Sequence, residues 1–205
     1  MGEGGAFGAV VFDLGGVLID WNPRYLYRKL FEDAGEMEDF LATVCSSAWD
    51  RRQDAGRPIS EGVAELKARH PDKAALIEAY YGRWPEMLNG AIDGTVEILA
   101  ELKDQGTPLY ALTNWEAETF PHARSRFGFL GWFRAIVVSG EVGLIKPDAD
   151  IYELLLATHG LTAGETVFID DKPENVEAAG ALGFHGIRFT EPESLRAALA
   201  ALGLL

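Results

Sequence analysis

The sequence predicts an α/β protein in which a doubly wound, Rossmann-like parallel sheet carries a small all-helical cap. The first observation is a set of four short runs in which nearly every residue is apolar, at 9–12, 108–112, 135–138 and 166–169. Such runs are typical of strands buried on both faces of a parallel sheet. The second observation is that helix-like segments lie before the second run, between the third and fourth runs, and after the fourth, and this alternation indicates a parallel sheet.

The helices between these strands have recognisable ends. We expect them to begin at an acidic N-cap or at a proline in the first helical position, and to end at a glycine. The expected starts are Asp93, Asp148 and Pro173, and the expected ends are Gly106, Gly160 and Gly183.

The region 21–89 has a different pattern, because no convincing strand lies within it. Asn22 and Pro23 resemble the start of a first helix, Ser60 is the expected cap of a second, and a third follows Pro71. We therefore expect a core formed by 1–20 and 90–205, with the helical cap at 21–89 inserted after the first strand. The glycine-rich start, MGEGG, is expected to be disordered.

Composition narrows the possible functions. Of 205 residues, 48% are hydrophobic and 24% charged, which is typical of a folded globular protein. The net charge of −14 and the scattered basic residues argue against nucleic-acid or membrane-surface partners. The longest apolar stretch, 6–19, contains Asp13 and is too short to span a bilayer, and no basic residue precedes Arg24. A cytoplasmic location is expected. The single Cys45 excludes an internal disulfide and a cysteine zinc cluster.

Polar side chains follow the predicted strands at the edge where open α/β sheets bind ligands. They are Asp13, Thr113 with Asn114, Lys146 with Pro147, and Asp170 with Asp171. Each alone is compatible with an ordinary cap, turn or surface charge. Together they suit one reaction: a carboxylate nucleophile, a carboxylate pair for Mg²⁺, a hydroxyl for phosphoryl oxygens and an ammonium that offsets charge.

Four segments, VVFDLGGVLID, LYALTNW, GLIKPD and VFIDDKPEN, resemble the four motifs of the haloacid dehalogenase (HAD) superfamily in order and spacing. The insert resembles the C1 cap of subfamily I, so the likeness covers nearly the whole chain. Within the superfamily, the chain is most similar to small bacterial sugar-phosphate phosphatases and to the phosphatase domain of soluble epoxide hydrolases.

This resemblance implies residue roles. Asp13 would be the nucleophile that forms an aspartyl-phosphate, Thr113 a phosphoryl ligand and Lys146 the residue that neutralises charge. Mg²⁺ would be held by Asp13, the Gly15 carbonyl, Asp170 and Asp171. The residues expected to contact substrate are Gly15, Gly16, Asn114 and Trp115. Asn175 is expected either to support the metal loop or to lie on the surface of the following helix. The expected partner is a small phosphorylated metabolite of the sugar-phosphate class, bound by a monomer or homodimer.

One departure from the family pattern concerns the general acid. Family phosphatases usually carry a second aspartate two residues after the nucleophile, where this chain has Gly15. A placed acid accelerates departure of a poor leaving group ~10²–10⁴-fold. Either another group supplies the proton, or the leaving group, such as an anomeric or acyl oxygen, departs without one.

Four alternatives to a phosphatase of this superfamily remain. A metal-independent 2-haloacid dehalogenase would use the same nucleophile and also lacks the second aspartate, but it needs no Asp170–Asp171 pair. A receiver-type phospho-acceptor domain has its acidic pair first and no helical insert. A non-catalytic phospho-ligand binding protein would keep the fold. The segment from Cys45 to Arg51 matches the skeleton of cysteine phosphatases, but it lacks glycine and contains Trp49 and Asp50.

The cap residues that contact substrate are harder to predict. Most aromatic residues of the insert are expected in its core. Candidates to face the substrate are Trp21, Trp49 and Trp115, and candidates to bind sugar hydroxyls are Asp50, Arg52 and Asp54. The histidines show no metal-ligand spacing, although His122 follows the Thr113 segment closely enough to approach the site.

Overall fold

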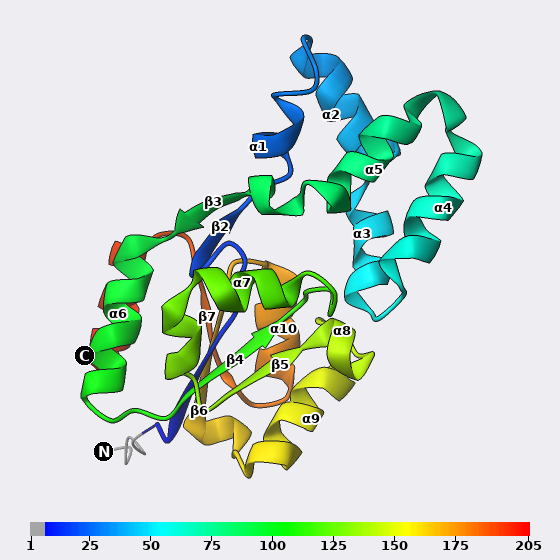
Figure 1. Ribbon diagram of the computed structural model, residues 1–205. Helices are drawn as coiled ribbons and strands as arrows, with labels where there is room; N and C mark the ends of the chain where they lie inside the picture. Colours follow the sequence, from blue (N-terminus) through cyan, green and yellow to red (C-terminus); the bar gives the residue numbers. More distant parts are fainter. Residues whose placement is uncertain (1–6) are drawn as a thin grey trace.

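A computed structural model describes residues 7–205 and shows the predicted parallel α/β fold (Figure 1). The five strands β1 (Ala9–Phe12), β4 (Leu109–Thr113), β5 (Ala135–Val138), β6 (Thr166–Asp170) and β7 (His185–Arg188) lie in the order β5-β4-β1-β6-β7. All neighbouring pairs are parallel. The MGEGG segment lies outside the described residues.

Helices cover both faces of the sheet, which explains why its central strand is apolar at every position. Val10 and Phe12 belong to a cluster that includes residues of α6 (Asp93–Asp104), α7 (Phe120–Arg126) and α11 (Pro192–Ala201). Ala9 and Val11 belong to a second cluster with α9 (Ala149–His159) and α10 (Pro173–Ala181). Successive side chains of β1 therefore enter two different cores.

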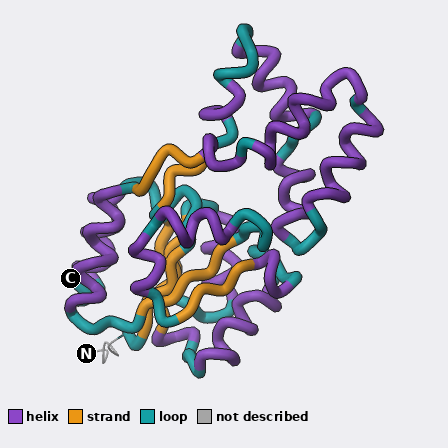
Figure 2. Tube along the Cα trace, in the orientation of Figure 1, coloured by secondary structure: helices purple, strands orange, loops and turns teal. Residues whose placement is uncertain are grey.

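Between β1 and α6 the chain leaves the sheet and returns along an antiparallel ribbon, β2 (Ile19–Trp21) and β3 (Leu88–Ala91). Five α-helices lie between these strands: α1 (Arg24–Tyr27), α2 (Ala34–Thr43), α3 (Ser47–Asp54), α4 (Ile59–Arg69) and α5 (Ala74–Gly82). Figure 2 shows them as a helical lobe beside the sheet, joined to it by the strand ribbon. Tyr27, Phe40, Trp49 and Tyr80 are buried in contact with one another, as expected for most aromatic residues of the insert.

Several expected boundaries were wrong. The region 21–89 does contain strand residues, since β2 ends and β3 begins inside it. Ser60 lies within α4 rather than at its cap, because the helix already begins at Ile59, after Pro58. Asp93 is the first residue of α6 rather than its N-cap. Cys45 is buried and follows α2.

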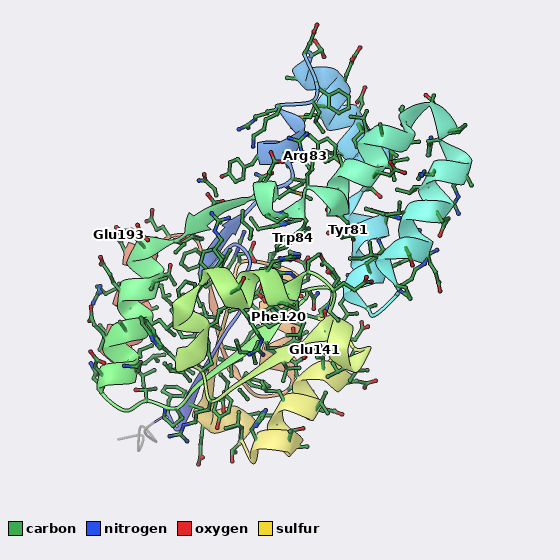
Figure 3. The ribbon with its side chains drawn as sticks, in the orientation of Figure 1. Tyr81, Arg83, Trp84, Phe120, Glu141 and Glu193 are labelled. Carbon is green, nitrogen blue, oxygen red and sulfur yellow. The ribbon has the colours of Figure 1, made fainter. Side chains whose placement is uncertain are left out.

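The helical lobe packs on the sheet lobe through aromatic rings. Trp84 of the insert lies 5.3 Å from Trp115 between ring centroids, and Trp115 lies 5.5 Å from Phe120 of α7. Figure 3 labels Trp84 in the insert and Phe120 on α7. A second contact joins α3 to the short helix α8 (Ser139–Val142). No described helix has both the length and the hydrophobicity to cross a membrane.

Gly140 fits its position in α8 because it has no side chain. An added Cβ would lie 2.5 Å from the Ala117 backbone nitrogen and 2.8 Å from the Trp115 carbonyl oxygen. Because both atoms are backbone, Gly140→Ala is expected to lower the free energy of unfolding by about 1–3 kcal/mol. Gly164→Ala is the matched control, since its Cβ would meet no atom within 4 Å. Equal denaturation midpoints for the two variants would contradict this packing.

Candidate active site

The sheet order brings the predicted strand-end residues to one place. Strand β1 lies between β4 and β6, with Phe12 opposite Ala111 on one side and Ile169 on the other. Asp13 therefore follows the central strand beside Thr113, the last residue of β4, and Asp170, the last residue of β6. All three side chains are buried. This is the carboxyl edge of the sheet, where α/β proteins of this kind bind ligands.

Lys146 supplies the positive charge at this edge. Its Nζ lies 3.0 Å from Asp13 Oδ1 and 2.6 Å from Asp170 Oδ2, and it donates to the Leu112 carbonyl oxygen at 2.7 Å. The residue is only 1% exposed. Burial alone would lower the pKa of this ammonium, but the two carboxylates raise it overall. Lys146 is thus a fixed cation between two acidic groups.

Two asparagines hold the charged residues in place. Asn114 accepts the backbone N–H of Lys146 through Oδ1 and donates to the Lys146 carbonyl oxygen through Nδ2, both at 2.9 Å. Its amide is thus engaged with the protein's own backbone. Asn175, in the first turns of α10, donates to both Asp170 oxygens at 3.0 Å. Asn175 therefore supports the loop after β6, in agreement with its expected role.

Three carboxylates form a group with the geometry of a cation site. Oxygens of Asp13, Asp170 and Asp171 all lie within 4.8 Å of one another. Asp171 Oδ1 is buried without a hydrogen-bond partner in the described structure. Lys146 offsets only part of this charge. Burial raises the pKa of Asp13 to about 7, and the negative charges of Asp170 and Asp171 oppose its ionisation. The donor set therefore fits Mg²⁺, which prefers carboxylate oxygens.

Gly16 allows Asp171 to approach the loop after β1. The φ angle of Gly16 is +79°, a conformation that favours glycine, and an added Cβ would lie 2.9 Å from Asp171 Oδ2. A side chain at residue 16 would displace the carboxylate. Gly16 thus leaves room for the carboxylate of Asp171, the residue that follows the neighbouring strand β6.

A cavity of about 770 Å³ opens above this group, between the sheet edge and the helical lobe. Most of the predicted core residues line it: Asp13, Gly15, Gly16, Asn114, Trp115, Lys146 and Asp171. Thr113 and Asp170 are buried and are not among the residues that line the cavity. Trp115 is almost completely buried, and it donates its indole N–H to Thr119 Oγ1 at 3.0 Å.

The insert contributes some of the predicted cap residues to this cavity and not others. Trp21, Asp50 and Asp54 line it. Trp49 instead donates its indole N–H to the Gly62 carbonyl oxygen inside the helical lobe, and Arg52 pairs with Glu65. His122 is exposed on α7 and does not line the cavity.

Cys45 also lines the cavity, but its chemistry does not suit a cysteine phosphatase. Burial raises the pKa of the thiol to about 12. The residue lies against Tyr27, whose hydroxyl is 3.9 Å from the sulfur. A neutral thiol at this position is a poor nucleophile, and the Cys45–Arg51 match is therefore without catalytic meaning.

Sequence reasoning missed Glu116. This buried residue follows β4 by three positions and faces the insert, where its carboxyl is hydrogen-bonded to that of Asp54. It lies just beyond the LYALTNW motif, and its closeness to a strand end is the one signal that was present in the sequence. Lys172, which follows Asp171, also lines the cavity.

Comparison with known proteins identifies the family. The model of the haloacid dehalogenase-like hydrolases matches residues 7–183. The chain belongs to the haloacid dehalogenase-like hydrolases. This hydrolase is 31% identical to the sesquiterpene phosphatase astK of Aspergillus oryzae over 185 residues, covering 90% of this chain and 91% of that protein.

Two further similar proteins are more distant from this hydrolase. A phosphoglycolate phosphatase of Pectobacterium atrosepticum is 26% identical over 197 residues, covering 93% of this hydrolase and 83% of that enzyme. A HAD family enzyme of Bacteroides thetaiotaomicron superposes with a TM-score of 0.71 at 22% identity, covering 90% and 94% of the two chains. The structural likeness shows that the hydrolase and this enzyme share one fold.

Proposed function

We propose that the protein is an Mg²⁺-dependent phosphatase that transfers the phosphoryl group of a small phosphorylated metabolite to Asp13. The observation that carries this proposal is the group formed by Asp13, Asp170 and Asp171, with its unpartnered buried oxygen beside a single ammonium. Such an excess of negative charge would repel a phosphate unless a cation were bound. An HAD family enzyme of similar fold has been solved in complex with magnesium and inorganic phosphate, with a TM-score of 0.67.

Each residue then has a definite task. Asp13 attacks phosphorus with one carboxylate oxygen, and the aspartyl-phosphate that forms is hydrolysed by water. Lys146 neutralises charge beside the attacking carboxylate, and Thr113 binds a phosphoryl oxygen. Asp13, the Gly15 carbonyl, Asp170 and Asp171 would hold Mg²⁺, which screens the negative charge of the phosphoryl oxygens.

The substrate class that we propose is a sugar phosphate. The cavity offers a carboxylate and an arginine, Asp50 and Arg51, as partners for hydroxyl groups. Among the relatives is a phosphorylated carbohydrates phosphatase of Thermotoga maritima, 26% identical over 183 residues. The cavity also has an apolar wall that includes Leu41, Ala48 and Trp84, so a terpenyl phosphate is the competing substrate to compare.

The main rival is a metal-independent dehalogenase. The fold does not separate the two, because solved dehalogenases also superpose on this chain, with TM-scores of 0.63 and 0.62. The charge of the site does separate them. A halide leaves without a metal, and a third carboxylate at Asp171 would then only add repulsion. A non-catalytic binding protein would have no use for a nucleophile paired to Lys146.

Phosphate release with and without metal tests this proposal. We expect the protein to release phosphate from p-nitrophenyl phosphate with added Mg²⁺ and to lose this activity in excess chelator. A panel of sugar phosphates and terpenyl phosphates then ranks the substrates by kcat/KM. Halide release from 2-chloropropionate that survives chelation, without phosphate release from any ester, would overturn the proposal.

A further inference from the structure

The loop after β1 carries no acid for the leaving group. Gly15 lines the cavity, and a Cβ built on it would meet no atom within 4 Å. The position that bears the general acid in related phosphatases is therefore open space in this protein. A leaving oxygen above Asp13 must receive its proton from another wall of the cavity, or depart as an anion.

A pair of carboxyl groups lies in another wall of the same cavity. Asp54 comes from the end of α3 in the insert, and Glu116 comes from the loop after β4 in the sheet lobe. Both residues line the cavity together with Asp13, and the two carboxyls are hydrogen-bonded to each other. Two ionised carboxylates cannot form such a bond, so the pair shares a proton.

The hydrogen bonds around the pair indicate which residue holds this proton. Glu116 accepts the Thr119 hydroxyl at 2.5 Å, and Thr119 in turn accepts the Trp115 indole N–H at 3.0 Å. Among the described residues, no such donor reaches Asp54. Glu116 is therefore the ionised acceptor, and Asp54 is the protonated donor.

The charges that surround Asp54 agree with this assignment. Burial raises the pKa of Asp54 well above its usual value, and the charges of Asp50 and Glu116 raise it further. Lys172 is the opposing cation. Asp50 accepts the Tyr81 hydroxyl at 2.8 Å, and Tyr80 also bonds to it. Glu118 is a further negative charge acting on Glu116.

We propose that Asp54 is the general acid of this enzyme, supplied by the cap instead of by the loop after β1. This proposal rests on the proposed phosphatase function. As the bond between phosphorus and the ester oxygen breaks, phosphorus bonds to Asp13 and the Asp54 proton moves to the departing oxygen. The Asp54 carboxylate then takes a proton from the water that attacks the aspartyl-phosphate. The second step restores Asp54 and releases inorganic phosphate, so no other proton donor is consumed.

In this arrangement, protonation of the leaving group depends on the position of the cap. The pair joins a residue of the insert to a residue of the sheet lobe, so the proton donor is in place only while the two lobes are in contact. The contact between α3 and α8 and the hydrogen bond from the Ile59 N–H to Glu118 hold this end of the insert against the core.

The test is the dependence of kcat/KM on the leaving group, measured for Asp54→Asn against a series of aryl and alkyl phosphates. The parameter kcat/KM reports the first, phosphoryl-transfer step. The variant is expected to lose ~10²–10⁴-fold on alkyl phosphates and little on p-nitrophenyl phosphate, whose leaving group needs no proton. The wild type is expected to show a flat series. Asp39→Asn, an exposed cap carboxylate outside the cavity, is the matched control.

The pH dependence of kcat/KM is a second test, because it would not change if Asp54 had a purely structural role. Because the acid must be protonated, wild-type kcat/KM for an alkyl phosphate is expected to fall as pH rises through the pKa of Asp54. This fall is expected to disappear in Asp54→Asn and to occur at lower pH in Glu116→Gln, which removes the negative neighbour. Equal losses on aryl and alkyl phosphates, or no loss on either, would overturn the assignment of Asp54. Absence of p-nitrophenyl phosphate hydrolysis by the wild type would instead overturn the phosphatase function.

Discussion

Asp13→Asn is expected to abolish turnover by about 10⁴-fold or more while leaving the fold intact. The amide has nearly the shape of the carboxylate, but it cannot attack phosphorus. Stability is expected to hold, because the change removes one of the negative charges grouped with Asp170 and Asp171. The measurement is kcat with p-nitrophenyl phosphate, combined with a denaturation curve.

Asp20→Asn is the matched control for this variant. Asp20 is a partly buried carboxylate on β2 that accepts the Tyr25 hydroxyl and the Asn89 amide, and it does not line the cavity. Its replacement is expected to leave turnover close to wild type. If Asp13→Asn kept more than about a tenth of wild-type turnover, equivalent to ~1.4 kcal/mol of barrier, Asp13 would not be the nucleophile.

Lys146→Met is expected to remove both activity and stability. The ammonium lies between Asp13 and Asp170, and methionine has a similar length without the charge. Removing one partner of a buried ion pair leaves an uncompensated charge, which costs about 3–5 kcal/mol of folding free energy. Denaturation at neutral pH in metal-free buffer measures this loss, and phosphate release measures the activity.

Two comparisons distinguish charge from packing in this result. Lys29→Met removes an exposed ammonium that pairs with Glu86 at 2.8 Å, and it is expected to cost only about 0–1 kcal/mol. Adding Asp170→Asn to Lys146→Met removes one of the stranded carboxylates and is expected to restore part of the stability. A loss for Lys146→Met no larger than for Lys29→Met would contradict the assignment of Lys146 as the central cation.

The sequence was sufficient to predict four of the five strands of the parallel sheet, β1, β4, β5 and β6, because each is a short and almost uninterrupted apolar run. It did not predict β7, whose edge position leaves His185 and Arg188 exposed. The ribbon of β2 and β3 was also missed. Its strands are short, and β3 contains Asn89 and Gly90, residues that are uncommon in strands. These elements form through pairing with distant segments rather than through a local pattern.

The residues of the candidate site also divide into those that a local sequence pattern predicts and those that depend on contacts between distant segments. Asp13, Thr113 and Asp170 were predicted together because parallel strands end at one edge, which makes their closeness a consequence of topology. The pair of Asp54 and Glu116 was not predicted. One carboxyl lies on a cap helix and the other in a loop of the sheet lobe. No local sequence pattern predicts how the two lobes pack against each other. The role of the Asn114 amide likewise depends on the path of the Lys146 loop.

Covalent capture of the intermediate tests the central claim most directly. Enzyme and substrate are mixed with Mg²⁺ under single-turnover conditions and quenched in acid at successive times. Each sample is then digested and its peptides are weighed by mass spectrometry. We expect the peptide that contains Asp13 to carry one additional phosphoryl group at early times and to lose it as phosphate appears, with no such peptide from Asp13→Asn. Release of phosphate in one turnover with the phosphoryl group on another residue, or with no peptide modified at any time, would contradict the account.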